Sequence, residues 1–267
     1  MLPTLLTVQH LKTRTGQDGY LRLADLIAVV QEECAGNGSE ILEPFHIPAP
    51  PSDIRSFLQD ELEASKYPRI WQAVLYSTNT FIDQIWGLLH PADRDVVLSD
   101  LMPVFLAYGV SFPASNAALL HDYLVAEKLE FVPGHFSVKY GDRQAQHTLT
   151  MFDGTNHGYD YLIWAVGTPR NISKNESQLI QNILKRGIAS RHSHGGICIE
   201  HAGQRMVGNN GSVQHSLRVV GEITNGELFF VSALEIIANH SQRAVNSLLE
   251  QILGRRSEQE DLASAIQ

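Results

Sequence analysis

Cysteine is scarce in this sequence. Cys34 and Cys198 are its only two cysteines, and they are far apart and in no C-x-x-C arrangement. A chain that stays reduced in the cytoplasm is therefore expected, with both thiols buried as small apolar residues. Long apolar runs are also missing, and the N-terminal residues have neither the apolar length nor the basic leader of a signal peptide. The sequence thus predicts a soluble protein without a membrane partner.

An excess of positive charge is missing as well. The formal net charge of the 267 residues is −9, and the pI is about 5.7. A surface that binds a phosphate backbone needs clustered positive charge, so we expect no nucleic-acid partner. Two hydrolase signatures are also absent: there is no G-x-S-x-G, and no Ser/His/Asp triad can be argued from spacing.

Residues 159–170, YDYLIWAVGTPR, form the first of two informative stretches. Residues 161–166 are almost continuously apolar, which is typical of a strand covered on both faces. Gly167 follows and allows the backbone to turn without a Cβ. This pattern predicts a buried strand that ends at a ligand crevice.

Residues 217–226, LRVVGEITNG, form the second stretch. Leu217, Val219 and Val220 lead into Gly221 and Glu222, so a carboxylate is expected at the carboxyl end of a strand. Open α/β sheets bind their ligands at this position. By the residues alone, Glu222 is either a ligand-binding acid or an acid at a helix start.

As a pair, these stretches resemble the later part of a flavoprotein with two dinucleotide-binding folds. Residues 160–169 match the pattern D-x-x-hydrophobic-x-x-x-G-x-P of the strand that returns to the FAD domain. Gly221 and Glu222 resemble the Gly-Asp pair whose acid holds the ribitol of FAD. Residues 69–98 and 221–253 are similar to the FAD/NAD(P)-binding family with a helical insertion, which is distantly related to the lysine and ornithine N-monooxygenases. The resemblance covers roughly residues 67–253.

The resemblance implies an α/β fold of the Rossmann-like, two-dinucleotide-binding type, with a β-meander and a helical insertion. It also implies an oxidoreductase that uses FAD and NAD(P)H on a small-molecule substrate, in which the cofactor carries the redox step. No catalytic side chain is assigned. The implied cofactor-binding residues are Gly167, Thr168, Pro169, Gly221, Glu222, Thr224, Asn225 and Gly226. The first three alternatively only turn the chain.

The glycine-rich phosphate loop of such flavoproteins, G-x-G-x-x-G between a strand and a helix, is not found in this sequence. The glycines that come nearest have the wrong spacing or context: Gly16, Gly19, Gly36, Gly38, Gly203, Gly208 and Gly211. The chain is therefore interpreted as truncated, split from its first half, or decayed. A partner chain that supplies the missing FAD-binding half is expected under the second interpretation. The alternative is a non-catalytic binding or interaction subunit that retains the scaffold without cofactor.

Histidines offer a rival site. His192 and His194 share one face if residues 191–196 are extended, and His201 could supply a third imidazole nitrogen to a metal. No carboxylate stands at a diagnostic spacing, so we predict a polar loop and no metal site. A metal-dependent hydrolase remains the third hypothesis.

The chain order predicts four parts. Residues 1–51 are an N-terminal α/β remnant with a proline-rich connection, residues 52–112 a helical insertion, residues 113–254 the Rossmann-like region, and residues 255–267 a charged, frayed tail. Helices are expected at 18–36, 92–106, 117–128, 171–187 and 232–253, with Pro103 bending or ending the second early. Meander strands are expected at 129–132, 136–140 and 147–152. The tryptophans of residues 69–98 are expected in the core.

Overall fold

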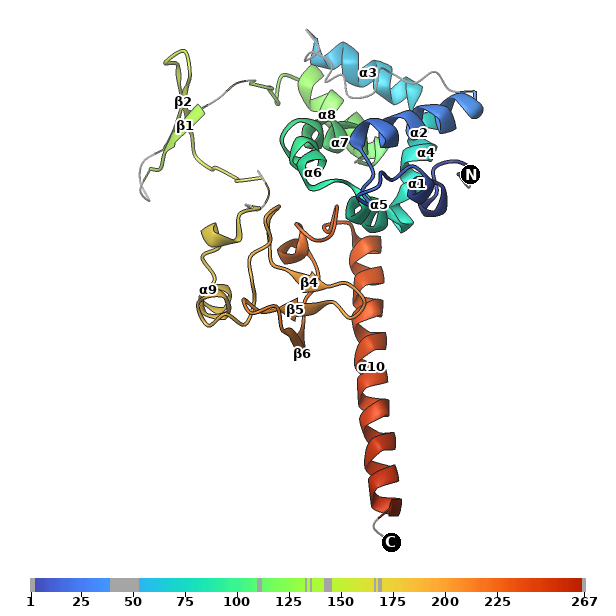
Figure 1. Ribbon diagram of the computed structural model, residues 1–267. Helices are drawn as coiled ribbons and strands as arrows, with labels where there is room; N and C mark the ends of the chain where they lie inside the picture. The colour runs from blue at the N-terminus through green and yellow to red at the C-terminus, as the bar shows by residue number, and fades with distance from the viewer. Residues whose placement is uncertain are drawn as a thin grey trace. The chain divides into compact units, whose positions relative to one another are not determined.

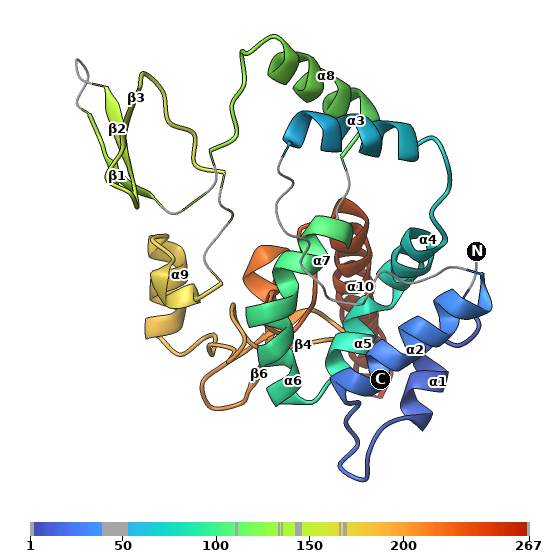
Figure 2. The same ribbon diagram turned by 90° about the horizontal axis from the view of Figure 1, so that it is seen from above.

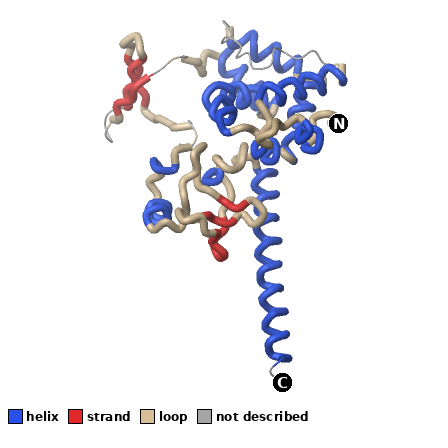
Figure 3. Tube along the Cα trace, viewed as in Figure 1, coloured by secondary structure: helices blue, strands red, loops and turns tan. Residues whose placement is uncertain are grey.

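The computed structural model describes residues 3–38, 53–109, 112–132, 134, 136–141, 146–165, 167 and 170–265. The chain divides into two compact units: residues 1–47, 69–110 and 169–267 form the first, and residues 48–68 and 111–168 form the second. Helix predominates over strand (Figure 3). The described strands form two three-stranded sheets, and all their pairs are antiparallel. The mixed α/β class is therefore confirmed, whereas the expected parallel sheet is not seen in the described residues.

The first unit contains most of the helices and one sheet (Figures 1 and 2). Its elements are α1 (Val8–Thr13), α2 (Leu23–Gly36), α4 (Ile70–Ser77), η1 (Thr78–Thr80), α5 (Ile82–Leu88), α6 (Pro91–Val96), η2 (Val97–Leu101), α7 (Met102–Gly109), η3 (Ile172–Lys174), α9 (Gln178–Lys185), β4 (Ile199–Glu200), β5 (Arg205–Val207), β6 (Val213–Arg218), η4 (Glu222–Thr224) and α10 (Leu234–Ala265).

A helical core holds the N-terminal half of this unit together. Its buried side chains are Leu6, Leu11, Leu21, Val29, Cys34, Val74, Ile82, Ile85, Trp86, Leu89, Phe229 and Ile236. The helix predicted for residues 18–36 is confirmed as α2, which ends at Gly36 as expected but begins at Leu23, five residues later than predicted. Trp86 and Cys34 are buried, and Trp71 packs against the core. The prediction that these residues are packing elements is confirmed, whereas Cys198, whose thiol was also expected to be buried, is only half-buried.

Pro103 does not end its helix, so of the two expected effects, bending or early ending, the second is wrong. The helix runs from α6 through η2, a π-helical turn, into α7 without a break. Proline lacks the N–H that an interior helical residue donates. The wider turn directly before Pro103 is the kind of local adjustment that accommodates such a residue in a continuing helix.

A second core lies under the sheet of the first unit. It buries Ile172, Leu184, Ala189, Ile197, Ile199, Met206, Leu228 and Val231. Strand β6 pairs antiparallel with β5 and ends at Arg218, so of the strand expected to lead from Leu217 into Gly221 only Leu217 and Arg218 are strand, and the pairing is not parallel. Residues 227–231 join the two cores, because Leu228 belongs to one and Phe229 to the other.

The second unit contains α3 (Ile54–Ala64), α8 (Ala114–Val125), β1 (Phe136–Lys139), β2 (His147–Met151) and β3 (Asn156–Tyr159). Helices α3 and α8 pack together, and the three strands form a meander in the order β1-β2-β3. The meander is confirmed, but its strands differ from the prediction. Residues 129–132 are not a strand, and β3 replaces them after the turn at Gly154.

The strand expected at 159–166 is also wrong, because its described residues after Tyr159 have no regular structure. Trp164 instead stacks on Phe136 of the meander and donates from Nε1 to the Tyr140 hydroxyl over 2.7 Å. Tyr161 and Ile163 are 88% and 87% exposed. An apolar run forms a central strand only where neighbours cover both faces, whereas these two side chains are left exposed.

Helix α10 is longer than expected. It runs through Ala265, so the frayed tail predicted from Arg255 is helical backbone. Helices α8 and α9 begin at Ala114 and Gln178, three residues earlier and seven later than predicted for 117–128 and 171–187. No helix in the described part of the chain is both long and apolar enough to cross a bilayer. The four-part division stays a prediction.

A buried carboxylate ties α5 to α10. Asp83 accepts a hydrogen bond from His240 Nε2 at 2.6 Å, from Arg243 Nη2 at 3.1 Å and from the Phe229 N–H at 3.1 Å. His240 is fully buried. Burial raises the pKa of Asp83, but the hydrogen bonds and the charge of His240 outweigh it and hold the pKa below its usual value. This network fixes the start of α10 against the helical core.

We predict that Asp83→Asn lowers the free energy of unfolding by about 3 kcal/mol, because it removes the charge that His240 and Arg243 face. Urea denaturation at pH 7 measures this loss. Asp18→Asn, which breaks an exposed pair with Arg22, is the control and should change little. Equal effects of the two substitutions would contradict the structural role of Asp83.

Candidate functional site

The 191–196 loop is a tight polar loop of the first unit. Its ends are joined by a bridge between Arg191 and Ile197, and the His192 N–H donates to the Gly196 carbonyl over 3.1 Å. Gly195 and Gly196 have positive φ angles of 116° and 65°, which residues with a side chain rarely adopt. The glycines therefore allow this loop to close on itself.

The 221–226 turn packs directly against this loop. Gly221 has a φ of 86°, and its carbonyl accepts from both the N–H and the hydroxyl of Thr224. A Cβ on Gly196 would collide with the Ile223 carbonyl, and one on Gly226 would collide with the Gly195 carbonyl. The two segments approach more closely than any side chain would permit.

Arg170 joins the end of the first informative stretch to the second. Its carbonyl accepts the Gly196 N–H at 3.0 Å, and its Nη2 donates to the carbonyl of Asn225. In addition, the Ile197 N–H donates to the Ile223 carbonyl over 2.9 Å. The structure thus brings together Arg170, the 191–196 loop and the 221–226 turn, which are far apart in sequence.

The predicted cofactor-binding residues differ in how exposed they are. Glu222 is exposed and Gly221 is half-buried, whereas Thr224, Asn225 and Gly226 are buried. Gly167 is exposed in the second unit, with a φ of 75°. Thr168 and Pro169 lie outside the described residues. Of the 221–226 turn, therefore, Gly221 and Glu222 are the better placed to meet a ligand, and the cofactor roles stay predictions.

Glu227 binds two of the three histidines. Its carboxylate accepts from His192 Nε2 at 3.0 Å and from His201 Nε2 at 2.8 Å. The His194 N–H donates to His192 Nδ1, so His192 uses Nε2 as its donor toward the carboxylate. Burial raises the pKa of Glu227, but the hydrogen bonds from the two imidazoles outweigh this and lower it to about 2. Glu227 is therefore an ionised anchor for the loop.

His194 turns to the opposite side. Its Nε2 lies 3.3 Å from both the Asp95 carboxylate and the Pro91 carbonyl, which are acceptors, so Nε2 holds the proton. Its Nδ1 is 3.3 Å from the Ser193 hydroxyl. Burial lowers the pKa of His194, which favours the neutral imidazole.

Ser193, His194 and Asp95 thus form a chain of contacts like that of a hydrolytic triad. The neighbouring Gly195 and Gly196 N–H groups are already bonded to the carbonyls of His192 and Arg170. They are consequently not available to stabilise an oxyanion, which acyl transfer requires. The arrangement supports a polar binding surface better than a hydrolase.

The three histidines do not converge on one point. His192 and His201 donate to Glu227, and His194 faces Asp95. Within the described ranges, no group of three or more histidine, cysteine, aspartate or glutamate side chains could hold a metal ion. Trp86 contacts both segments: its Nε1 donates to the Gly226 carbonyl of the 221–226 turn over 2.9 Å, and its ring lies edge-on to His194 of the loop.

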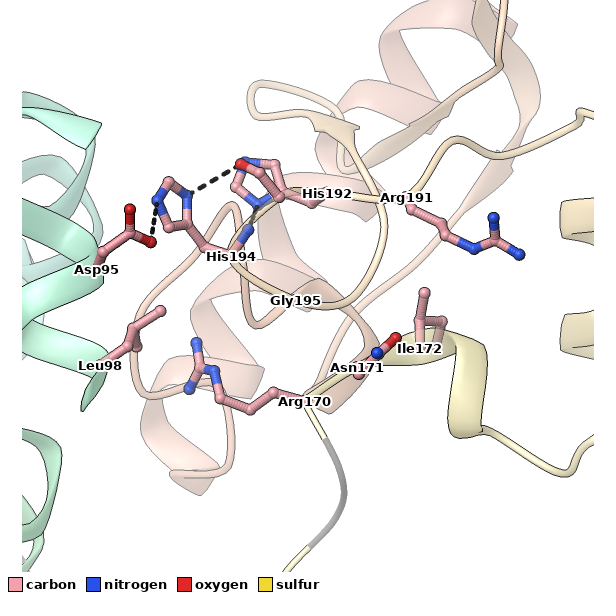
Figure 4. Close-up of a pocket in the computed structure, with 10 residues that line it drawn as sticks. Asp95, Leu98, Arg170, Asn171, Ile172, Arg191, His192, His194 and Gly195 are labelled. Atoms are coloured by element: carbon pink, nitrogen blue, oxygen red, sulfur yellow. Dashed lines mark hydrogen bonds and ion pairs between the residues drawn. The ribbon is translucent and has the colours of Figure 1, made fainter. Parts of the chain in front are cut away.

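A cavity of about 330 Å³ opens beside the loop (Figure 4). Its lining residues are Asp95, Leu98, Arg170, Asn171, Ile172, Arg191, His192, Ser193, His194 and Gly195. Two guanidinium groups face one carboxylate in this set. The volume is at the lower end of the range for small-molecule sites.

Sequence reasoning missed Asp95 and Glu227 as members of this site. Glu227 stands directly after the predicted turn, but only the folded chain shows that it meets His192 and His201. Asp95 lies on α6, some hundred residues before the loop, and no spacing rule links the two. The cluster of histidines itself was the available signal. No protein-family model matches this sequence, and no curated protein matches it either.

We predict that Gly226→Ala destabilises the protein by about 2 kcal/mol, because its Cβ would overlap the Gly195 carbonyl and the His192 ring. Gly36→Ala is the matched control. That glycine ends α2 with open space around it, so the change should be neutral or slightly stabilising. Urea denaturation of both variants tests the prediction, and similar stabilities would contradict the packing described.

Glu227→Gln should lower the free energy of unfolding at pH 7 by on the order of 1–2 kcal/mol. A folded pKa of about 2 against an ordinary value of 4.5 means that the carboxylate stabilises the fold above about pH 4.5. This stabilisation is lost as the pH falls toward 2. The difference between wild type and variant, measured by denaturation from pH 7 to pH 3, should therefore shrink at the acidic end, and a constant difference would refute the pKa assignment.

Proposed function

We propose that this chain is an FAD/NAD(P)-binding, oxidoreductase-like protein that lacks the first FAD-binding motif and acts with a partner segment that supplies it. One observation carries the proposal. Arg170, at the end of the first flavoprotein-like stretch, is bonded to Asn225 in the second and to Gly196 between them. The residue that follows the first flavoprotein-like motif therefore contacts the second stretch within the first unit.

Exposed apolar residues support the need for a partner. Tyr161 and Ile163, in the stretch that resembles the returning strand, are almost fully exposed. A central strand of a dinucleotide fold is covered by neighbours on both sides. A Rossmann-like sheet, completed by strands from the partner, would provide that cover. This finer fold is part of the proposal.

Glu222 is the residue we expect to contact the flavin. It is exposed at the start of the 221–226 turn, and a carboxylate there can accept hydrogen bonds from ribitol hydroxyls. The backbone of Gly221, at a φ of 86° with open space around it, permits close approach. When bound, FAD supplies the hydride and electron transfer, and the chain's residues orient it and exclude water.

The alternative is a non-catalytic binding or interaction subunit. The missing phosphate loop favours this alternative, and so does the burial of Thr224, Asn225 and Gly226. Under it, the 221–226 turn only supports the 191–196 loop. Flavin binding distinguishes the two functions.

We expect the purified chain to bind FAD, seen as a change in the visible absorption spectrum and as about one flavin per chain in equilibrium dialysis. Glu222→Ala should weaken binding about tenfold through loss of the hydrogen bonds to ribitol. Glu250→Ala removes the same charge from the exposed side of α10 and should leave binding unchanged. A chain that binds no FAD at high concentration is either a fragment that needs its partner segment or the non-catalytic alternative.

A further inference from the structure

Helix α10 packs against the first unit along one side. Ile236, His240 and Ala244 are buried on this side, and the Gln251 side-chain oxygen accepts from Arg218 Nη2 over 3.0 Å. Residues that recur at such intervals lie on one face of a helix. This body-facing side of α10 is therefore occupied by the chain itself.

A second stripe on α10 is apolar and exposed. Its members are Val245, Leu248, Leu249, Ile252 and Leu253, which are between 41% and 61% exposed. They recur at intervals of three and four residues, so they are neighbours on the helix surface. Single exposed apolar residues are common on protein surfaces, whereas a contiguous stripe of five large ones marks an interaction site.

The helix also continues well beyond Gln251. Its backbone runs on to Ala265, about 21 Å further at 1.5 Å per residue. Figure 1 shows this part of α10 extending past the sheet formed by β4, β5 and β6. Most helical stability in proteins comes from the packing of an apolar face. A helix that extends this far is consequently stabilised by a surface to pack against.

The order of residue types along α10 fits a second copy of the same helix. The apolar residues of 245–253 are followed by Arg255 and Arg256, then by acids at 258, 260 and 261, and then by the small, mainly apolar residues 262–265. Two antiparallel copies that cross near residue 257 bring the arginines of each copy close to the acids of the other. They also bring the two apolar blocks together. Parallel copies would instead place like charges beside each other, which is unfavourable.

We propose that the chain forms a homodimer through the exposed stripe, with the two α10 helices antiparallel. Such a contact is isologous, because each copy contributes the same surface. The overlap covers roughly residues 249–265 of each copy, about 24 Å of helix, so the interface is small and the dimer dissociates at concentrations on the order of micromolar. It contains no residue of the candidate site and does not depend on the proposed cofactor.

Sedimentation velocity of the full chain from about 1 to 100 µM tests the dimer. We expect wild type to change from monomer to dimer over this range, and Leu249→Glu to weaken the dimer about tenfold or more, because it places a charge in the apolar contact. Asn246→Glu adds the same charge at an exposed position of α10 outside the stripe and should behave like wild type. Circular dichroism confirms that both variants keep their helix.

Three results would overturn the homodimer: a wild-type chain that stays monomeric throughout, a dimer that Leu249→Glu leaves intact, or equal effects of the two variants. The first of these would mean that the stripe binds a different protein.

The distance between nitroxide labels, measured by double electron–electron resonance, tests the orientation. The labels are attached at Asn246→Cys in a Cys198→Ser background, since Cys34 is buried. Antiparallel helices that cross near residue 257 place the two labels about 33 Å apart along the axis. Parallel helices, which pack about 8–10 Å apart, would bring them within about 20 Å and would refute the antiparallel arrangement.

Discussion

Contact between backbone and backbone, with no room for a side chain, holds the candidate site together. Gly195 and Gly196 lie directly against Ile223, Asn225 and Gly226, and Arg170 completes the junction through its carbonyl and its guanidinium. Such contacts are specific because they depend on the missing Cβ atoms and on particular φ angles. The cavity, the orientation of the histidines and the position of Arg170 all depend on this junction.

Charge is distributed unequally around the junction. On one side Glu227 is ionised and accepts from two imidazoles, so its negative charge is fully engaged. On the other side Arg170 is partly buried near the charge of Glu222 and donates from Nη2 to the Asn225 carbonyl, whereas Arg191 is exposed. The charges that are paired within the site stabilise the loop.

Local patterns predicted the helices better than the sheets. The stripe of α2, its end at Gly36 and the burial of Trp86 follow from apolar spacing and from glycine, which act within a few residues. Strands depend on partners far along the chain, and the stretch after Tyr159 lacks the neighbours that would make it a central strand. The continuation of the helix through Pro103 depends on a π-helical turn that has no sequence signature.

The site was predictable in part. Its glycines, the histidine cluster and Glu222 stand out in the sequence, because each is unusual in its local context. Asp95 and Glu227 do not, because their meaning comes from contacts across the fold. Thr224, Asn225 and Gly226 are likewise buried because they pack against the loop, which their residue types do not predict.

Residues 227–231 belong to both cores of the first unit. Leu228 and Val231 face one core and Phe229 the other, while the Phe229 N–H is bonded to Asp83. Neither core can loosen without disturbing this shared segment. The helical part and the small sheet are thus coupled and should unfold as one cooperative unit. Strain in the 191–196 loop would therefore also disturb the packing of α5 and α10.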